Sequence, residues 1–161
     1  MSTQSVTTPR WLSAEQQRHW RAYVEGAALL SEALGRQLER DADLASTEYE
    51  LLVRLSEAPD RTLRMSLIAA ELAHSRSRIT HTIHRMEARG FVERFACEAD
   101  GRGVNCRMTD AGLAWLVQAA PGHVEAVRAA VVDVLTDDQL RALGDAMGAV
   151  RDGLRAPQKA R

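Results

Sequence analysis

Arginine is the residue type in this chain that is best placed to do chemistry, and it is concentrated in one stretch. From Arg61 to Arg107 the sequence holds nine arginines and five acidic residues, a balance of +4, whereas the whole chain carries −1. The planar guanidinium group can donate two parallel hydrogen bonds, in bidentate fashion, to a phosphate or to the edge of a guanine base. A basic stretch within an otherwise acidic chain therefore indicates DNA as the partner.

Three histidines, His74, His81 and His84, lie close to one another within the same stretch. Two histidines three residues apart on one helix face could bind zinc. No carboxylate or cysteine nearby completes a zinc site, and the same helix face carries the arginines. We therefore interpret these histidines as structural or DNA-contacting, and we expect no metal and no other cofactor.

Motifs of the common enzyme classes are missing from the sequence. It contains no glycine-rich phosphate loop, no HExxH motif, and no serine or cysteine in the context of a nucleophile. The adjacent carboxylates Asp137 and Asp138 are accounted for as favourable charges at a helix N-terminus. The sequence therefore does not predict an enzyme.

The two cysteines, Cys97 and Cys106, are too few for a disulfide framework. They fall on opposite strands of a predicted hairpin, where regular pairing places Cys97 nearer Val104 and leaves Cys106 about one pair out of register. A cytosolic environment would also keep thiols reduced. We interpret both as small, half-buried hydrophobic residues, and a redox role for either one stays open.

The elements that position the arginines are expected within residues 65–109, as a short helix, a tight turn and a second helix. Ser75 is placed to cap the second helix at its N-terminus, and Gly90 follows its last periodic residues. The apolar face of the second helix is predicted to consist of Ile79, Ile83 and Met86. The buried face of the first is predicted to consist of Leu67, Ile68 and Leu72.

A hairpin follows the second helix. Phe91, Val92, Phe95 and Cys97 lead out, and residues 104–108 lead back. The turn is expected at Asp100-Gly101, because glycine accepts a positive φ without a Cβ clash. A helix-turn-helix followed by a hairpin with a basic tip is typical of a winged helix that binds DNA.

Long amphipathic helices flank this module on both sides. Ser13 and Gln16 have the spacing of a capping box, Ser46 and its neighbours are expected to cap the next helix, and Thr109-Asp110 begins another. That helix is expected to kink at Pro121-Gly122 rather than stop, since apolar periodicity resumes beyond it. A small winged-helix core cannot bury such long apolar stripes, so we expect a homodimer.

The predicted fold class is mainly α, a winged helix-turn-helix with a small β-hairpin wing and long N- and C-terminal dimerisation helices. The predicted divisions are a disordered lead (1–11), a dimerisation helix (12–45), the DNA-binding region (46–109), dimerisation helices (110–154) and a basic tail (155–161). No run of eighteen apolar residues and no signal peptide is present, so a cytoplasmic protein without membrane association is expected.

The run LAHSRSRITHTIHRMEARGFVER, the pattern Asp100-Gly-Arg102-Gly and the run MTDAG from Met108 together resemble the MarR family of bacterial regulators. The resemblance extends from about Leu12 to Val150 and includes Pro121-x-His123. It implies a winged-helix homodimer, usually a repressor, that small phenolic or lipophilic ligands often release from DNA. Some members sense oxidants through a cysteine instead, and a few bind zinc.

The resemblance also implies where DNA is bound. The helix from Ser75 to Arg89 is expected in the major groove, and the family's Asp-x-Arg pattern puts Arg102 of the wing in the minor groove, with Asp100 orienting it. His84, Arg85 and Arg89 are expected to contact phosphates or to make no contact with DNA. The expected DNA-binding residues are Ser75, Arg76, Ser77, Arg78, His81, Arg85, Arg94, Asp100 and Arg102.

A pocket for a small aromatic or lipophilic effector would, by the same resemblance, lie between the DNA-binding module and the dimer helices. The candidate lining residues are Trp20, Tyr23, Tyr49, Trp115 and His123. Aromatic residues at helical spacing are more often core than ligand cage, so the sequence does not identify an effector.

The predicted function is that of a ligand-responsive repressor, a homodimer on a pseudo-palindromic operator of roughly 16 to 20 base pairs. The alternatives are a protein-interaction module of the same fold that has lost DNA binding, and a thiol- or metal-responsive regulator. The wing arginine and the arginine-rich helix favour DNA binding over the first alternative.

Overall fold

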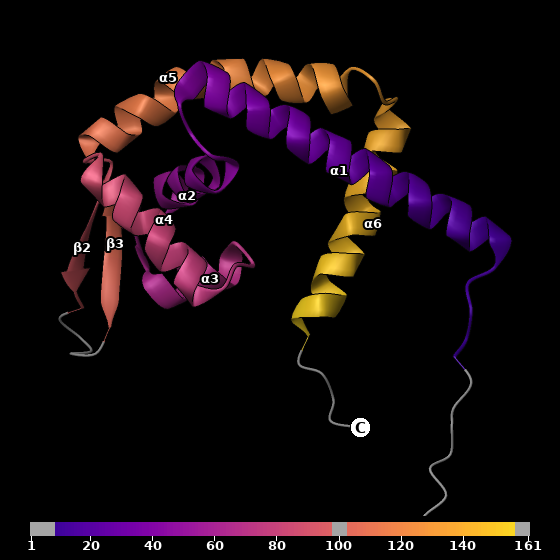
Figure 1. Cartoon of the computed structure of the whole chain (residues 1–161), viewed down its shortest axis with the longest axis horizontal. Helices are drawn as coiled ribbons and strands as arrows, with labels where there is room; N and C mark the ends of the chain where they lie inside the picture. The colour runs from indigo at the N-terminus through magenta and orange to yellow at the C-terminus, as the bar shows by residue number, and fades with distance from the viewer. Residues whose placement is uncertain (1–8, 98–102, 157–161) are drawn as a thin grey trace, which may run out of the picture. The chain divides into compact units, whose positions relative to one another are not determined.

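The structure is a computed structural model, and it describes residues 9–97 and 103–156. The predicted hairpin turn at Asp100-Gly101, the wing residue Arg102, and most of the predicted lead and basic tail lie outside the described residues. Figure 1 shows the elements. The helices are α1 (Ala14–Ala42), α2 (Ser46–Glu57), α3 (Met65–Glu71), α4 (Arg76–Ala88), α5 (Asp110–Val127) and α6 (Asp137–Arg155), and the strands are β1 (Thr62–Arg64), β2 (Val92–Ala96) and β3 (Val104–Met108).

The chain divides into two compact units, residues 1–33 and residues 34–161. In the first unit, α1 begins with the predicted capping box. The Gln16 backbone N–H donates to Ser13 Oγ (3.1 Å), and the Ser13 backbone N–H donates to Gln16 Oε1 (2.9 Å). Most side chains along this part of α1 are exposed, Trp20 and Tyr23 among them.

The core of the second unit lies where α2, α3 and α4 pack on the sheet. The predicted apolar face of α4 is confirmed, because Ile79, Ile83 and Met86 are fully buried. The prediction for α3 is partly wrong. Ile68 and Leu72 are buried, but Leu67 is 44% exposed. Ala69 is buried where Leu67 was predicted to be. A helix of only seven residues packs a single narrow face against the core, and Leu67 lies outside that face.

The start of α2 also differs from the prediction. Ser46 is the first residue of the helix, and Ala45 before it is the N-cap. Alanine has no side-chain acceptor, so Glu48 alone caps this end by accepting a hydrogen bond from the Ala45 backbone N–H (Oε2, 2.9 Å). The next predicted caps are confirmed: Thr109 accepts from Gly112 N, and Thr136 forms a capping box with Gln139.

The wing is a three-stranded antiparallel sheet in the order β1-β3-β2, whereas the sequence predicted only two strands. β1 has three residues, too few for a periodic signal. The register also corrects the predicted pairing of the cysteines: Cys97 N donates to Gly103 O (2.8 Å), and Cys106 lies opposite Arg94 and Leu63. Neither cysteine is in a disulfide bond within the described residues, and both side chains are buried, not half-buried.

Beyond the wing, α5 continues through Pro121 as far as Val127, and a π-helical turn, Arg128–Val132, follows it. The prediction that this proline does not end the helix is therefore confirmed. None of the helices within the described ranges has the length and apolarity that crossing a bilayer requires.

Candidate nucleic-acid interface

Helix α4 buries one face and leaves the opposite face exposed. Ser75 is its N-cap, as predicted, and its Oγ accepts a hydrogen bond from the Arg78 backbone N–H at 3.3 Å. The buried side holds α4 against the core. The opposite side exposes the predicted DNA-contacting residues of this helix, which are Arg76, Ser77, Arg78, His81 and Arg85.

Two arginines in the first turn of α4 keep their charge available. Within the described ranges, the guanidinium groups of Arg76 and Arg78 have no hydrogen bond and no ion pair. They stand at a helix N-terminus, where unpaired backbone N–H groups and the helix dipole already favour an anion. This end of α4 is therefore suited to phosphate and to the edges of bases.

Arg78→Ala is expected to change the preference among operator variants, because an arginine that pairs with guanine contributes about 1–3 kcal/mol of discrimination. Titration of the variant against a set of singly substituted operators would measure this preference. Equal weakening on every operator would instead make Arg78 a phosphate contact.

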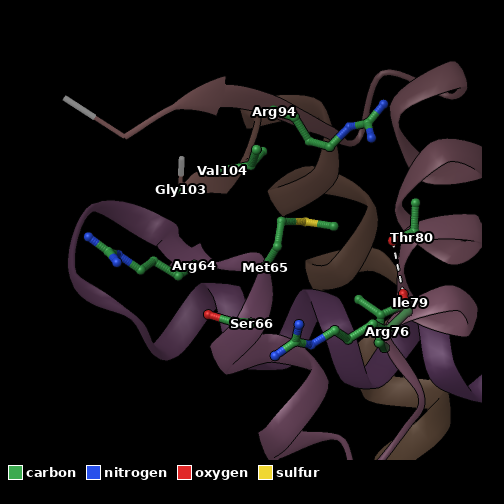
Figure 2. Close-up of a pocket in the computed structure, with 9 residues that line it drawn as sticks. All are labelled: Arg64, Met65, Ser66, Arg76, Ile79, Thr80, Arg94, Gly103 and Val104. Carbon is green, nitrogen blue, oxygen red and sulfur yellow. Dashed lines mark hydrogen bonds between the residues drawn. The ribbon is translucent and has the colours of Figure 1, made fainter. Parts of the chain in front are cut away.

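A concavity of about 450 Å³ lies between α3, the start of α4 and the wing. Figure 2 shows three arginines around it, Arg64 at the end of β1, Arg76 on α4 and Arg94 on β2. Arg64 donates to the sulfur of Cys97 (Nη2–Sγ, 3.2 Å). Arg64 was not among the DNA-contacting residues predicted from the sequence, because the strand β1 that places it beside the wing was not predicted.

Other predicted DNA-contacting arginines are held by carboxylates. Arg94 binds Glu87 through Nε (3.1 Å) and Nη2 (2.6 Å), and these hydrogen bonds lower the pKa of Glu87 and raise that of Arg94. Arg85 forms an ion pair with Glu48. The structure thus gives both arginines partners within the chain, and their contact with DNA stays a prediction.

Three of the candidate effector residues, Tyr49, Trp115 and His123, belong to the second unit. Tyr49 packs against His123, with 4.4 Å between ring centroids, and His123 Nδ1 lies 3.0 Å from Gln37 Oε1. Burial lowers the pKa of His123. Trp115 Nε1 donates to the Ala42 carbonyl oxygen (2.9 Å), which gives this ring a structural role.

The two remaining candidates, Trp20 and Tyr23, belong to the unit of residues 1–33. There they contact each other, with 5.7 Å between ring centroids, and both are largely exposed. The effector role of all five residues stays a prediction. Within residues 9–97 and 103–156, no three His, Cys, Asp or Glu side chains form a group that could hold a metal ion.

Cys106 is expected to resist alkylation in the folded protein. It is fully buried, and burial raises the pKa of its thiol to about 12, so the reactive thiolate is scarce at neutral pH. Mass spectrometry after treatment with N-ethylmaleimide should find Cys106 modified only when denaturant is present. Equal labelling of Cys106 in the folded and the denatured chain would contradict this prediction.

Comparison with known proteins places this geometry in context. The profile of the MarR family matches residues 44–104. The structure is similar to that of Sco3205, a MarR family transcriptional regulator from Streptomyces coelicolor crystallised with DNA, at 47% identity and a TM-score of 0.90, over 94% of this chain and 95% of that one. A comparison with curated protein sequences found no match.

Two further solved structures share the fold. AbsC, a MarR family transcriptional regulator from Streptomyces coelicolor, is 36% identical with a TM-score of 0.87, over 92% of this chain and 100% of that one. A mutant of MarR from E. coli, crystallised with operator DNA, is 20% identical with a TM-score of 0.73, over 84% of this chain and 95% of that one. At that identity, the second likeness concerns the fold alone.

Proposed function

Because this chain belongs to the MarR family of DNA-binding transcriptional regulators, we propose that it is a ligand-responsive repressor that acts as a homodimer on a pseudo-palindromic operator. Members of this family regulate transcription and are not enzymes, in agreement with the absence of catalytic motifs from the sequence. The cytoplasm is the compartment we propose for it.

The observation that carries this proposal is the first turn of α4, where Arg76 and Arg78 are exposed and have no partner within the described ranges. Behind them, Ile79, Ile83 and Met86 anchor the helix in the core. A rigid helix with unneutralised arginines at its N-terminal end is suited to insertion into a major groove. The DNA complex of Sco3205 supports the same reading by similarity.

A second copy of the chain is the partner we propose for the long helices. MarR family proteins are typically dimers. Within the described ranges α6 has no buried residue, and large apolar side chains are exposed on it and on α1. These are Trp20, Val24 and Leu29 on α1 and Leu143, Val150 and Leu154 on α6. A dimer that covers them would place two recognition helices roughly 34 Å apart, one turn of the duplex.

The effector class we propose is a small aromatic or lipophilic molecule. The resemblance to the MarR family supports this choice of effector. If the effector releases the protein from DNA, operator binding should be lost when the effector is added.

The experiment that tests the proposal is a fluorescence-anisotropy titration against the DNA upstream of the protein's own gene and against a scrambled duplex. We expect the upstream duplex to bind at least about 10³ times more tightly, with an affinity that falls as salt rises. Equal, salt-sensitive binding to both would contradict recognition of this operator. Absence of binding to either would favour a protein-interaction module of the same fold.

A further inference from the structure

Two ion pairs tie the C-terminal half of α4 to the corner where α1 ends and α2 begins. Arg85 Nη2 lies 3.0 Å from Glu48 Oε1 on α2. Four residues further on, Arg89 Nη2 lies 3.2 Å from Asp43 Oδ2, just beyond the end of α1. Because Arg85 and Arg89 are one helical turn apart, they point to the same side of α4.

The ion pair between Glu48 and Arg85 has a structural role, because Glu48 is buried. Its side chain is only 6% exposed, and its second oxygen, Oε2, accepts the Ala45 backbone N–H at the start of α2. A buried carboxylate needs partners for its charge, and leaving one without a cation is costly. Arg85 supplies that cation, so its guanidinium is directed at α2 by the needs of Glu48.

The second pair closes the end of a helix. The last carbonyl groups of a helix have no intrahelical donor, and a cation is favourable there. Arg89 Nη1 donates to the Asp43 carbonyl oxygen at 2.7 Å, and Trp115 Nε1 donates to that of Ala42 at 2.9 Å. The Arg89 guanidinium also lies over the ring of Phe91, 4.7 Å from its centroid.

We infer that Arg85 and Arg89 are positioning residues, which set the placement of the recognition helix through Glu48 and Asp43 and do not hold DNA phosphates. The inference rests on the proposed function, since it concerns how α4 meets an operator. It divides the arginines of this helix into two groups. Arg76 and Arg78 at the N-terminal end of α4 face the DNA. Arg85 and Arg89 at the C-terminal end hold the helix against α2 and the end of α1.

Two carboxylate variants test this inference without touching the arginines. Glu48→Gln keeps an oxygen for the Ala45 N–H and removes the charge that pairs with Arg85. Asp43→Asn keeps the backbone carbonyl and suits the left-handed conformation of this residue, whose φ is 49°. Glu50→Gln is the matched control, because Glu50 is an exposed carboxylate on the same helix.

Each variant is titrated against the operator and a scrambled duplex at several salt concentrations, after circular dichroism has shown that it is folded. Positioning predicts that Glu48→Gln and Asp43→Asn each lower the ratio of operator to scrambled affinity by about fivefold or more, the discrimination of one base contact. Glu50→Gln should leave the ratio unchanged. The ratio is independent of the active fraction, since one sample meets both duplexes, so simple destabilisation does not alter it.

The salt dependence gives a second readout. Arg85→Ala should leave the slope of log affinity against log salt unchanged, whereas loss of a phosphate contact reduces it by about one. An unchanged or higher operator preference in Glu48→Gln, or a reduced slope in Arg85→Ala, would overturn the inference. If the unmodified protein itself fails to discriminate between the duplexes, the proposed function fails, and the inference fails with it.

Discussion

Replacing Gly112 by alanine is expected to lower the free energy of unfolding by about 3 kcal/mol, the upper end of what overpacking costs. A Cβ built on Gly112 would lie 2.2 Å from the Phe91 carbonyl oxygen and 3.0 Å from Met108 Cγ. The Phe91 carbonyl oxygen is a backbone atom, so it cannot move away by a change of rotamer as a flexible side chain could. The junction between the wing and α5 would therefore have to move.

The hydrogen bonds around Gly112 explain why this junction resists such a movement. Thr109 N donates to the Phe91 carbonyl oxygen (3.0 Å), Thr109 Oγ1 donates to that of Gly90 (2.7 Å), and Gly112 N donates to Thr109 Oγ1 (3.1 Å). Together these bonds join the start of α5 to the residues that follow α4. A shift at Gly112 would strain all of them.

Urea denaturation followed by circular dichroism would measure the effect. Gly26→Ala is the matched control, since nothing lies within 4 Å of a Cβ at that position of α1. Alanine there should raise the free energy of unfolding by about 0.5–1 kcal/mol through helix propensity. Equal unfolding midpoints for Gly112→Ala and the unmodified protein would show that the junction yields more easily than its hydrogen bonds imply.

Arg102→Ala is expected to weaken operator binding by about 1–3 kcal/mol for each wing. The proposed homodimer carries two wings, so the operator complex would lose about 2–6 kcal/mol if the two contacts are independent. Arg102 lies outside the described residues, and its role follows from the Asp-x-Arg pattern of the family. The physical reason is that an arginine in a narrow minor groove meets an enhanced negative potential.

Arg107→Ala provides the matched control on the wing. Arg107 Nε donates to Glu93 Oε1 (2.7 Å), and its guanidinium lies 5.3 Å from the centroid of the Phe95 ring. A partly exposed ion pair of this kind is worth about 0–1 kcal/mol, so its loss should have a small effect on DNA binding. Anisotropy titrations and size-exclusion chromatography would compare the two variants. Operator binding by Arg102→Ala at the unmodified affinity would refute the wing contact.

Much of the local structure could be predicted from the sequence, because its causes lie within a few residues of one another. The caps at Ser13, Ser75, Thr109 and Thr136 are bonds between a side chain and a backbone group three residues away. The buried face of α4 follows from the helical period of Ile79, Ile83 and Met86. The helix-turn-helix and the wing, and with them the family, were therefore predictable from local pattern.

Tertiary structure alone decided the features that depend on distant partners. β1 is too short to be recognised by itself and exists because β3 pairs with it, far along the chain. Leu67 is exposed and Ala69 buried because the neighbours of α3, not its own period, select the inward face.

The arginines illustrate the same division between local and distant causes. Composition counts every arginine of the basic stretch alike. It could therefore indicate DNA as a partner, but it could not assign different roles to individual arginines. Arg85 is directed by the buried Glu48 and Arg94 by Glu87, while Arg76 and Arg78 have no partner within the described ranges. The charge was thus determined by the sequence, but packing decided which charges are neutralised within the chain and which remain available to a ligand.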